Sequence, residues 1–313
     1  MRIHTVTFNP AIDETIMLDR LIPGEVHRAR AVRQNAGGKG VNVASCLADW
    51  GADVMVHGLL GGDNAAPFDA LFADKGIADS FIRVAGSTRV NLKLVDDGGT
   101  TDINLDGMAV DEALVAKAIS RLIASVRAGD LVALSGSLPP GCPPDIYGVM
   151  VAQLRESGCR VLLDTSGVPL KHALDAAVLP HVIKPNRSEL AAWTGRAAMD
   201  RAGLLAVAEE LCRRGVELVV ISMGEEGALF VSAEGAVCAH LALDGVASTV
   251  GAGDAMVAGL AAALADGLSL EPLARLATGF AVGKLGMAGP NLPELNAVRA
   301  LAQEVSISAL TMA

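Results

Sequence analysis

The chain has 313 residues, of which 51% are hydrophobic and 19% are charged. This composition supplies a large apolar core and excludes an intrinsically disordered protein. The 25 basic and 35 acidic side chains give a net charge of −10, which argues against nucleic-acid binding, because that requires a basic surface. Five cysteines are scattered without CxxC spacing, so neither a disulfide framework nor a zinc site is expected.

Glycine is frequent, with 34 residues, and aromatic residues make up only 3%, so backbone groups in glycine loops are expected to carry much of any ligand recognition. The first 14 residues contain no continuous apolar stretch, so a secretory leader is not expected. The longest apolar run, 255–265, is shorter than the roughly 20 residues of a membrane span. We therefore expect a cytoplasmic protein without membrane or nucleic-acid partners.

Two early segments are extended and alternate between polar and apolar residues. They cover 13–34 and 90–105, and the second contains an Asp-Asp-Gly-Gly turn at 96–99 that is typical of a hairpin. We interpret them as a small β lid, formed by segments of about 13–34 and 88–106, inserted into one larger domain. From spacing alone, an edge hairpin of the main sheet is an equally good interpretation.

The middle of the chain alternates between short β-branched runs and helix-like stretches. This rhythm predicts an α/β fold with a mostly parallel central sheet and helices on both faces. The predicted strands are 131–134, 161–163, 181–183 and 217–222, and the predicted helices are 144–156, 169–177 and 202–214. The last third predicts helices at 254–266, 270–287 and 293–305, which are apolar nearly all round and are expected to support a site from below.

The most informative motif is STVGAGDAMVAG at 248–259. A glycine turn runs into an alanine-rich helix, and free amides at a helix N-terminus bind anions. Asp254 at this turn is placed to act as the base for an alcohol that attacks a phosphate, with the amides of Ala252, Gly253 and Asp254 holding the developing charge. The alternative is an ordinary capping aspartate after a glycine turn.

Other nucleotide-site and nucleophile motifs are absent. A dinucleotide-binding GxGxxG fails because position 256 is Met, and a P-loop fails because Lys39 is followed by Gly40. Ser137 is followed by Leu-Pro-Pro, so the serine-hydrolase elbow GxSxG is not formed. A non-catalytic nucleotide-binding regulator remains as an alternative of a different class, although the intact glycine turn with its aspartate argues against it.

Three further segments carry polar groups suited to a sugar phosphate or a nucleotide. The stretch 35–44 combines a glycine cluster with a lysine and an asparagine, although a flexible loop with an exposed lysine is an equal alternative. Asn186 and Glu189 are spaced to offer oxygen ligands to Mg²⁺ through water, whereas a helix-capping box is the locally favoured interpretation. Alternate residues of 89–93 present two cations and an amide on one strand face, which a solvated edge also explains.

Taken in this order, the segments resemble the ribokinase-like sugar kinases of the phosphofructokinase B family. The stretches 36–44 and 248–259 are similar to the two family signatures, 184–189 to its NxxE motif, and 135–141 to a recurrent segment. The resemblance extends from Thr7 to about Ala288 and implies a single kinase domain over residues 1–313. Within the family, 8–13 and 88–94 are most similar to bacterial kinases of fructose 1-phosphate.

The resemblance also implies a set of site residues. The sugar would contact Asp13, Gly38, Asn42 and Asp254, and its existing phosphate would contact Lys39, Arg89 and Ser137, with Lys93 as an addition. The nucleotide and Mg²⁺ would lie against Lys184, Asn186, Glu189, Ser222, Gly224 and Gly227, with Gly251, Ala252 and Gly253 beneath the transferring group.

The implied reaction transfers the γ-phosphoryl group of ATP to the C6 hydroxyl of fructose 1-phosphate, with Asp254 as base. Tagatose 6-phosphate and then fructose 6-phosphate are the competing substrates. The family also implies a homodimer formed through the lid strands, and an adenine pocket built by the C-terminal helices.

Overall fold

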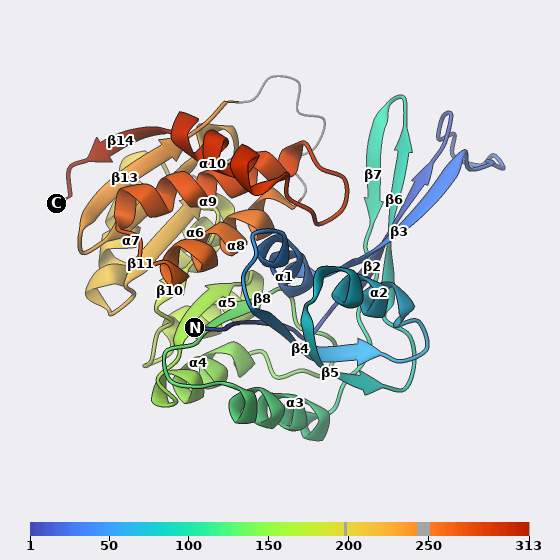
Figure 1. The fold of residues 1–313 in the computed structure, drawn as a ribbon, viewed down its shortest axis with the longest axis horizontal. Coiled ribbons are helices and arrows are strands. Elements are labelled where there is room, and N and C mark those ends of the chain that lie inside the picture. Colours follow the sequence, from blue (N-terminus) through green and yellow to red (C-terminus); the bar gives the residue numbers. More distant parts are fainter. Residues whose placement is uncertain (197–198, 243–250, 313) are drawn as a thin grey trace.

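The computed structural model describes residues 1–196, 199–242 and 251–312. Its main sheet has the strand order β14-β13-β12-β11-β10-β9-β8-β1-β4-β5 (Figure 1). The strands β11, β10, β9, β8, β1, β4 and β5 run parallel to one another, whereas each pairing from β11 to β12, β13 and β14 is antiparallel. The strands are β1 (Ile3–Thr7), β4 (Val54–Gly61), β5 (Ala78–Val84), β8 (Leu131–Ser135), β9 (Arg160–Asp164), β10 (Val182–Ile183), β11 (Leu218–Ser222), β12 (Ala228–Ser232), β13 (Gly235–His240) and β14 (Ser306–Leu310).

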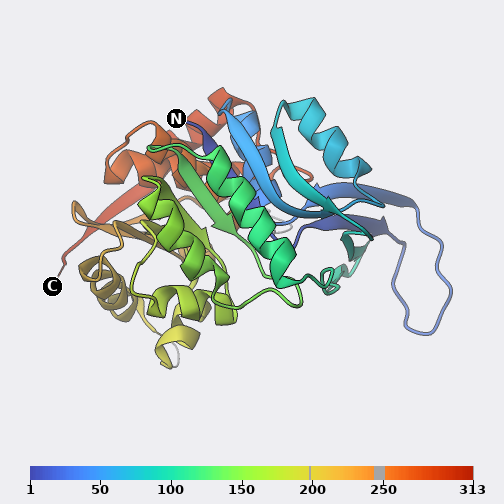
Figure 2. The same ribbon diagram turned by 90° about the horizontal axis from the view of Figure 1, so that it is seen from below.

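Helices cover both faces of this sheet, and each helical layer encloses its own apolar core. Successive side chains of a strand point to opposite faces of the sheet and therefore into different cores. In β8, Leu131 and Ala133 face one core, while Val132 and Leu134 face the other. The first layer holds α1 (Lys39–Asp49), α2 (Ala66–Lys75), α8 (Ala252–Ala265), α9 (Leu270–Leu285) and α10 (Leu295–Glu304). The second, in the foreground of Figure 2, holds α3 (Glu112–Ser125), α4 (Ile146–Glu156), α5 (Gly167–Asp175), α6 (Arg187–Thr194) and α7 (Arg201–Arg213).

This arrangement confirms the predicted fold class. The predicted strands and helices from residue 131 onward all occur, with ends that differ by at most two residues. No helix within the described ranges is long and apolar enough to cross a membrane. Because the parallel strands end at one edge of the sheet, the loops that follow β8, β9, β10 and β11 meet there, which is where open α/β sheets place their ligands.

A second, four-stranded sheet projects from one side of the main body (Figure 1). Its order is β3-β2-β6-β7, with β2 and β6 parallel and the other pairs antiparallel; the strands are β2 (Ala11–Met17), β3 (Ala31–Gly37), β6 (Arg89–Asp96) and β7 (Gly99–Ile103). It is separate from the main sheet, which rules out the alternative of an edge hairpin. The expected continuous extension over 13–34 is wrong for 18–30, which contain Pro23 and Gly24 and form no strand.

Candidate active site

The N-terminus of α8 is the centre of the site. Gly251 precedes the helix in a left-handed conformation (φ 81°), which glycine adopts without strain. The first intrahelical bond there runs from the Ala255 amide to the Gly251 carbonyl, so the amides of residues 252–254 have no helical partner and point toward an incoming anion. Residues 248–250 of the motif lie outside the described ranges.

Asp254 is the acid of this helix end, and it is buried. Only 8% of its surface is exposed, and burial raises the pKa of its carboxyl to about 6, against the opposing charge of Lys39. Asn42, from the first turn of α1, donates its Nδ2 hydrogen to Oδ2 of Asp254 at 2.8 Å. This bond joins two helix N-termini that are 212 residues apart in the chain.

Two lysines meet at a second buried acid, Asp164, which is 1% exposed and lies at the end of β9. Nζ of Lys39 and Nζ of Lys184 each lie 3.1 Å from its carboxylate. Burial alone would raise the pKa of Asp164, but the two ammonium groups hold it below its ordinary value. Both lysines were predicted from the sequence, whereas Asp164 was not, because its only local signal is an acid at the end of a buried strand.

The glycine-rich segment before Lys39 is not a flexible loop, because Lys39 is the first residue of α1. Gly38 precedes it with φ 101°, and a Cβ atom there would lie 2.8 Å from Cα of Pro10. The absence of a side chain therefore lets α1 start directly against the loop after β1. This close approach places Asn42 against Asp254 and Lys39 against Asp164.

The small sheet supplies the opposite wall. Asp13 on β2 accepts a hydrogen bond from Nδ2 of Asn91 on β6 at 3.1 Å, and Lys93 is ion-paired with Asp102 of β7 at 2.8 Å. Arg89 lies at the start of β6 and donates to the backbone carbonyls of residues 9, 10 and 105, which accounts for three of its five N–H groups. Its role in phosphate binding stays a prediction.

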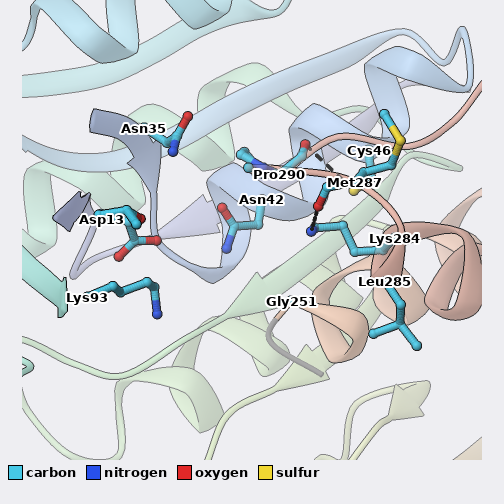
Figure 3. A pocket seen from close by; sticks show the side chains of 12 residues that line it. Asp13, Asn35, Asn42, Cys46, Lys93, Gly251, Lys284, Leu285, Met287 and Pro290 are labelled. Carbon is cyan, nitrogen blue, oxygen red and sulfur yellow. Dashed lines mark hydrogen bonds between the residues drawn. The ribbon is translucent and has the colours of Figure 1, made fainter. Parts of the chain in front are cut away.

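A cavity of about 200 Å³ lies between the small sheet and the C-terminal helices. Asp13 and Lys93 project from one side, Asn42 lies in the middle, and Lys284 and Gly251 lie on the far side (Figure 3). The rest of the lining comes from Thr15, Asn35, Cys46, Leu285, Met287, Gly289 and Pro290. The C-terminal helices were expected to support the site and to build an adenine pocket, but none of these lining residues of α9 and the loop after it was predicted.

The predicted nucleotide residues lie at and after the ends of the neighbouring strands β10 and β11. Asn186 forms a capping box with Glu189: the Asn186 side chain accepts from the Glu189 amide at 2.9 Å, and the Glu189 carboxylate accepts from the Asn186 amide at 2.8 Å. A parallel bridge joins Asn186 to Ser222, and the single turn Gly224–Glu226 and then Gly227 follow. Ser137, by contrast, accepts from the Asn9 side chain at 3.1 Å and does not line the cavity.

Comparison with known proteins assigns the chain to a family. A family model described as pfkB family carbohydrate kinase matches residues 6–295. The chain belongs to the pfkB carbohydrate kinases. It is 55% identical over 286 residues, or 90% of each chain, to the 1-phosphofructokinase of Xanthomonas campestris pv. campestris. It is 45% identical over 315 residues to that of Rhodobacter capsulatus, which covers 99% of this chain and 98% of the relative.

Solved structures of pfkB kinases share the fold. The crystal structure of phosphofructokinase-2 from Escherichia coli in complex with potassium superimposes with a TM-score of 0.90 at 27% identity, covering 96% of this chain and 98% of that one. The predicted ribokinase-like fold and the predicted family are thus both confirmed for this pfkB kinase.

The burial of Asp254 predicts a particular dependence of stability on pH. Its folded pKa of about 6 exceeds the ordinary 3.8, so the folded state binds more protons between pH 4 and 6, and this group's contribution to stability falls as the pH rises through that range. The unfolding free energy of Asp254→Asn minus that of the wild type is therefore expected to increase by on the order of 2–3 kcal/mol from pH 4 to pH 7.

Urea unfolding at several pH values measures this difference. Asp266→Asn is the matched control, because Asp266 is an exposed carboxylate at the other end of the same helix, and its difference from the wild type should stay constant. A constant difference for Asp254→Asn as well would show that the Asp254 carboxyl is not destabilised by burial.

Proposed function

We propose that this kinase is an ATP-dependent 1-phosphofructokinase, which converts fructose 1-phosphate and ATP to fructose 1,6-bisphosphate and ADP. The observation that carries the proposal is the buried Asp254 beside the free amides of α8. Its partner Asn42 and the preceding Gly251 line a cavity whose opposite wall is Asp13 and Lys93. The relatives named 1-phosphofructokinase, which match nearly the whole chain, support the choice of sugar phosphate.

The chemical step uses two features of the helix end. The C6 oxygen of the sugar attacks the γ-phosphorus of ATP, its proton passes to the Asp254 carboxylate, and the bond from the γ-phosphorus to the β,γ-bridging oxygen breaks to release ADP. The Asn42 hydrogen bond orients the carboxylate, and the amides of Ala252, Gly253 and Asp254 stabilise negative charge on the phosphoryl oxygens. A pKa near 6 leaves Asp254 mostly ionised at pH 7 while keeping it more basic than an ordinary aspartate.

The nucleotide phosphates are assigned to the edge formed by Lys184, Ser222, Gly224 and Gly227, and the adenine to the C-terminal helices. Lys184 lies close to α8, since a Cβ on Gly253 would be 3.6 Å from its Nζ. The side-chain oxygens of Asn186 and Glu189 already accept hydrogen bonds in the capping box. They are therefore better suited to contact Mg²⁺ through its bound water than to ligate it directly. When bound, Mg²⁺ supplies positive charge to the ATP phosphates.

On the sugar side, Asp13, Gly38 and Asn42 are assigned to hydroxyl groups, and Lys39, Arg89 and Ser137 to the C1 phosphate, with Lys93 beside them. The small sheet acts as a lid over this part of a single domain spanning residues 1–313, and its closure would exclude water. Exposed Val32 and Ile103 on its strands favour the pairing of two lids in a homodimer. A cytoplasmic location would provide ATP and sugar phosphates.

Parallel assays of ADP release with fructose 1-phosphate, tagatose 6-phosphate and fructose 6-phosphate test the proposal. We expect kcat/KM to favour fructose 1-phosphate by at least ~100-fold, equivalent to about 2.7 kcal/mol of transition-state discrimination. A preference for tagatose 6-phosphate would move the chain to the related activity, and turnover of none of the three would contradict the proposal.

Replacement of the base tests the mechanism. Asp254→Asn keeps the acceptor for Asn42 but cannot take a proton, so kcat is expected to fall by roughly 10²–10⁴-fold while KM for each substrate changes little. Steady-state kinetics of this variant, with Asp266→Asn as control, measures the loss. Near-normal turnover by Asp254→Asn would remove Asp254 from the mechanism.

The phosphate role of Arg89 predicts a selective effect. Loss of a charge-assisted contact in Arg89→Ala should raise KM for fructose 1-phosphate by roughly 10- to 100-fold and leave KM for ATP nearly unchanged. Arg83→Ala is the control, because Arg83 is an exposed arginine of β5 that pairs with Asp69 and Asp79. Equal increases of both KM values would contradict the assignment.

A further inference from the structure

Lys284 is a lysine of the cavity that neither the sequence motifs nor the proposed chemical step uses. It lies in the last turn of α9, is 8% exposed, and points into the cavity from the side opposite Asp13 and Lys93 (Figure 3). It borders the start of α8: a Cβ on Gly251 would lie 3.2 Å from its Cε and 3.8 Å from its Nζ. Its ammonium group is therefore beside the free amides of that helix.

The charge of Lys284 is not neutralised in the way that the other site lysines are. Lys39 and Lys184 both contact the Asp164 carboxylate, whereas Nζ of Lys284 donates to the backbone carbonyl of Met287 at 3.0 Å. Within the described ranges, no carboxylate lies within 4.0 Å of its Nζ. Burial lowers the pKa of Lys284, and the negative charge of Asp254 opposes that shift.

A buried ammonium group without a carboxylate partner costs free energy, and an anionic ligand removes that cost. One bond to a carbonyl leaves donors of the ammonium group available for such a ligand. The nearest anion-binding groups are the amides at residues 252–254, to which we have assigned the transferring phosphoryl group. The C1 phosphate, by contrast, has been assigned to Lys39, Arg89 and Ser137, none of which lines this cavity.

We propose that Lys284 is a further catalytic residue, whose ammonium group contacts the phosphoryl group during its transfer to the C6 oxygen. Lys284 keeps its proton and donates hydrogen bonds to the phosphoryl oxygens, while the proton of the attacking hydroxyl still passes to Asp254. This inference rests on the proposed function for the identity of the sugar, and only on the kinase family for the group transferred.

The full-length variant Lys284→Met tests the role, because methionine fills similar space without the charge. We expect kcat to fall at least ~100-fold and KM for fructose 1-phosphate and for ATP to stay within about threefold, since the contact forms in the transition state. Its unfolding free energy should equal or exceed that of the wild type, because a desolvated charge is removed. Lys117→Met, at an exposed lysine of α3, is the matched control and should leave all four values unchanged.

Two measurements separate this role from an anchor for the Met287 loop. In Lys284→Ala, added ethylammonium should restore kcat in a saturable manner, which a purely structural defect would not allow. Mg-ADP alone should raise the melting temperatures of the wild type and of Lys284→Met equally. Aluminium fluoride, which with Mg-ADP imitates the transferring group, should add a further increase in the wild type but none in Lys284→Met.

Three results would overturn the proposal. They are a kcat of Lys284→Met within threefold of the wild type, a raised KM for the sugar phosphate at unchanged kcat, or a loss of stability without rescue by ethylammonium. If the wild type turns over none of the three ketohexose phosphates, the proposed substrate fails, but the aluminium fluoride measurement still decides the role of Lys284.

Discussion

The burial of one carboxylate, Asp254, at the start of α8 is the constraint on which the rest of the site depends. Such a charge is tolerated because Asn42 donates to it and because Lys39 and Lys184 lie nearby, held by Asp164. These groups come from α1, β9 and the end of β10, so no single segment of the chain can build the site. The fold therefore serves to bring distant element ends together at one edge of the parallel sheet.

The two sides of the site differ in construction, and this difference suits a reaction between two substrates. The side proposed for the nucleotide consists of strand ends and a helix fixed by the Asn186 capping box. The side proposed for the sugar is a projecting four-stranded sheet, joined to the body through the loops around Arg89 and Gly38. A rigid anion site beneath a separate cover permits substrate entry and then exclusion of water.

Much of this could be predicted from sequence because the signals are local. The glycine turn before α8, the Asn186 and Glu189 capping box, and the hairpin turn at 96–99 each lie within a few residues. The pairing of Lys39 with Asp164 spans 125 residues and has no sequence period, so it could not be predicted. Lys284 was not predicted, because the apolar sequence of α9 does not show that the lysine in its last turn points into a cavity.

The central claim is that the fold places the attacking hydroxyl between Asp254 and the amides of α8. A crystal structure of the wild type with fructose 1-phosphate, Mg-ADP and aluminium fluoride tests this claim most directly. The account predicts the C6 oxygen within about 2.6–3.2 Å of the Asp254 carboxylate and the fluoride ligands against the amides of residues 252–254. A sugar bound with C6 away from Asp254, or a fluoride group bound away from α8, would contradict it.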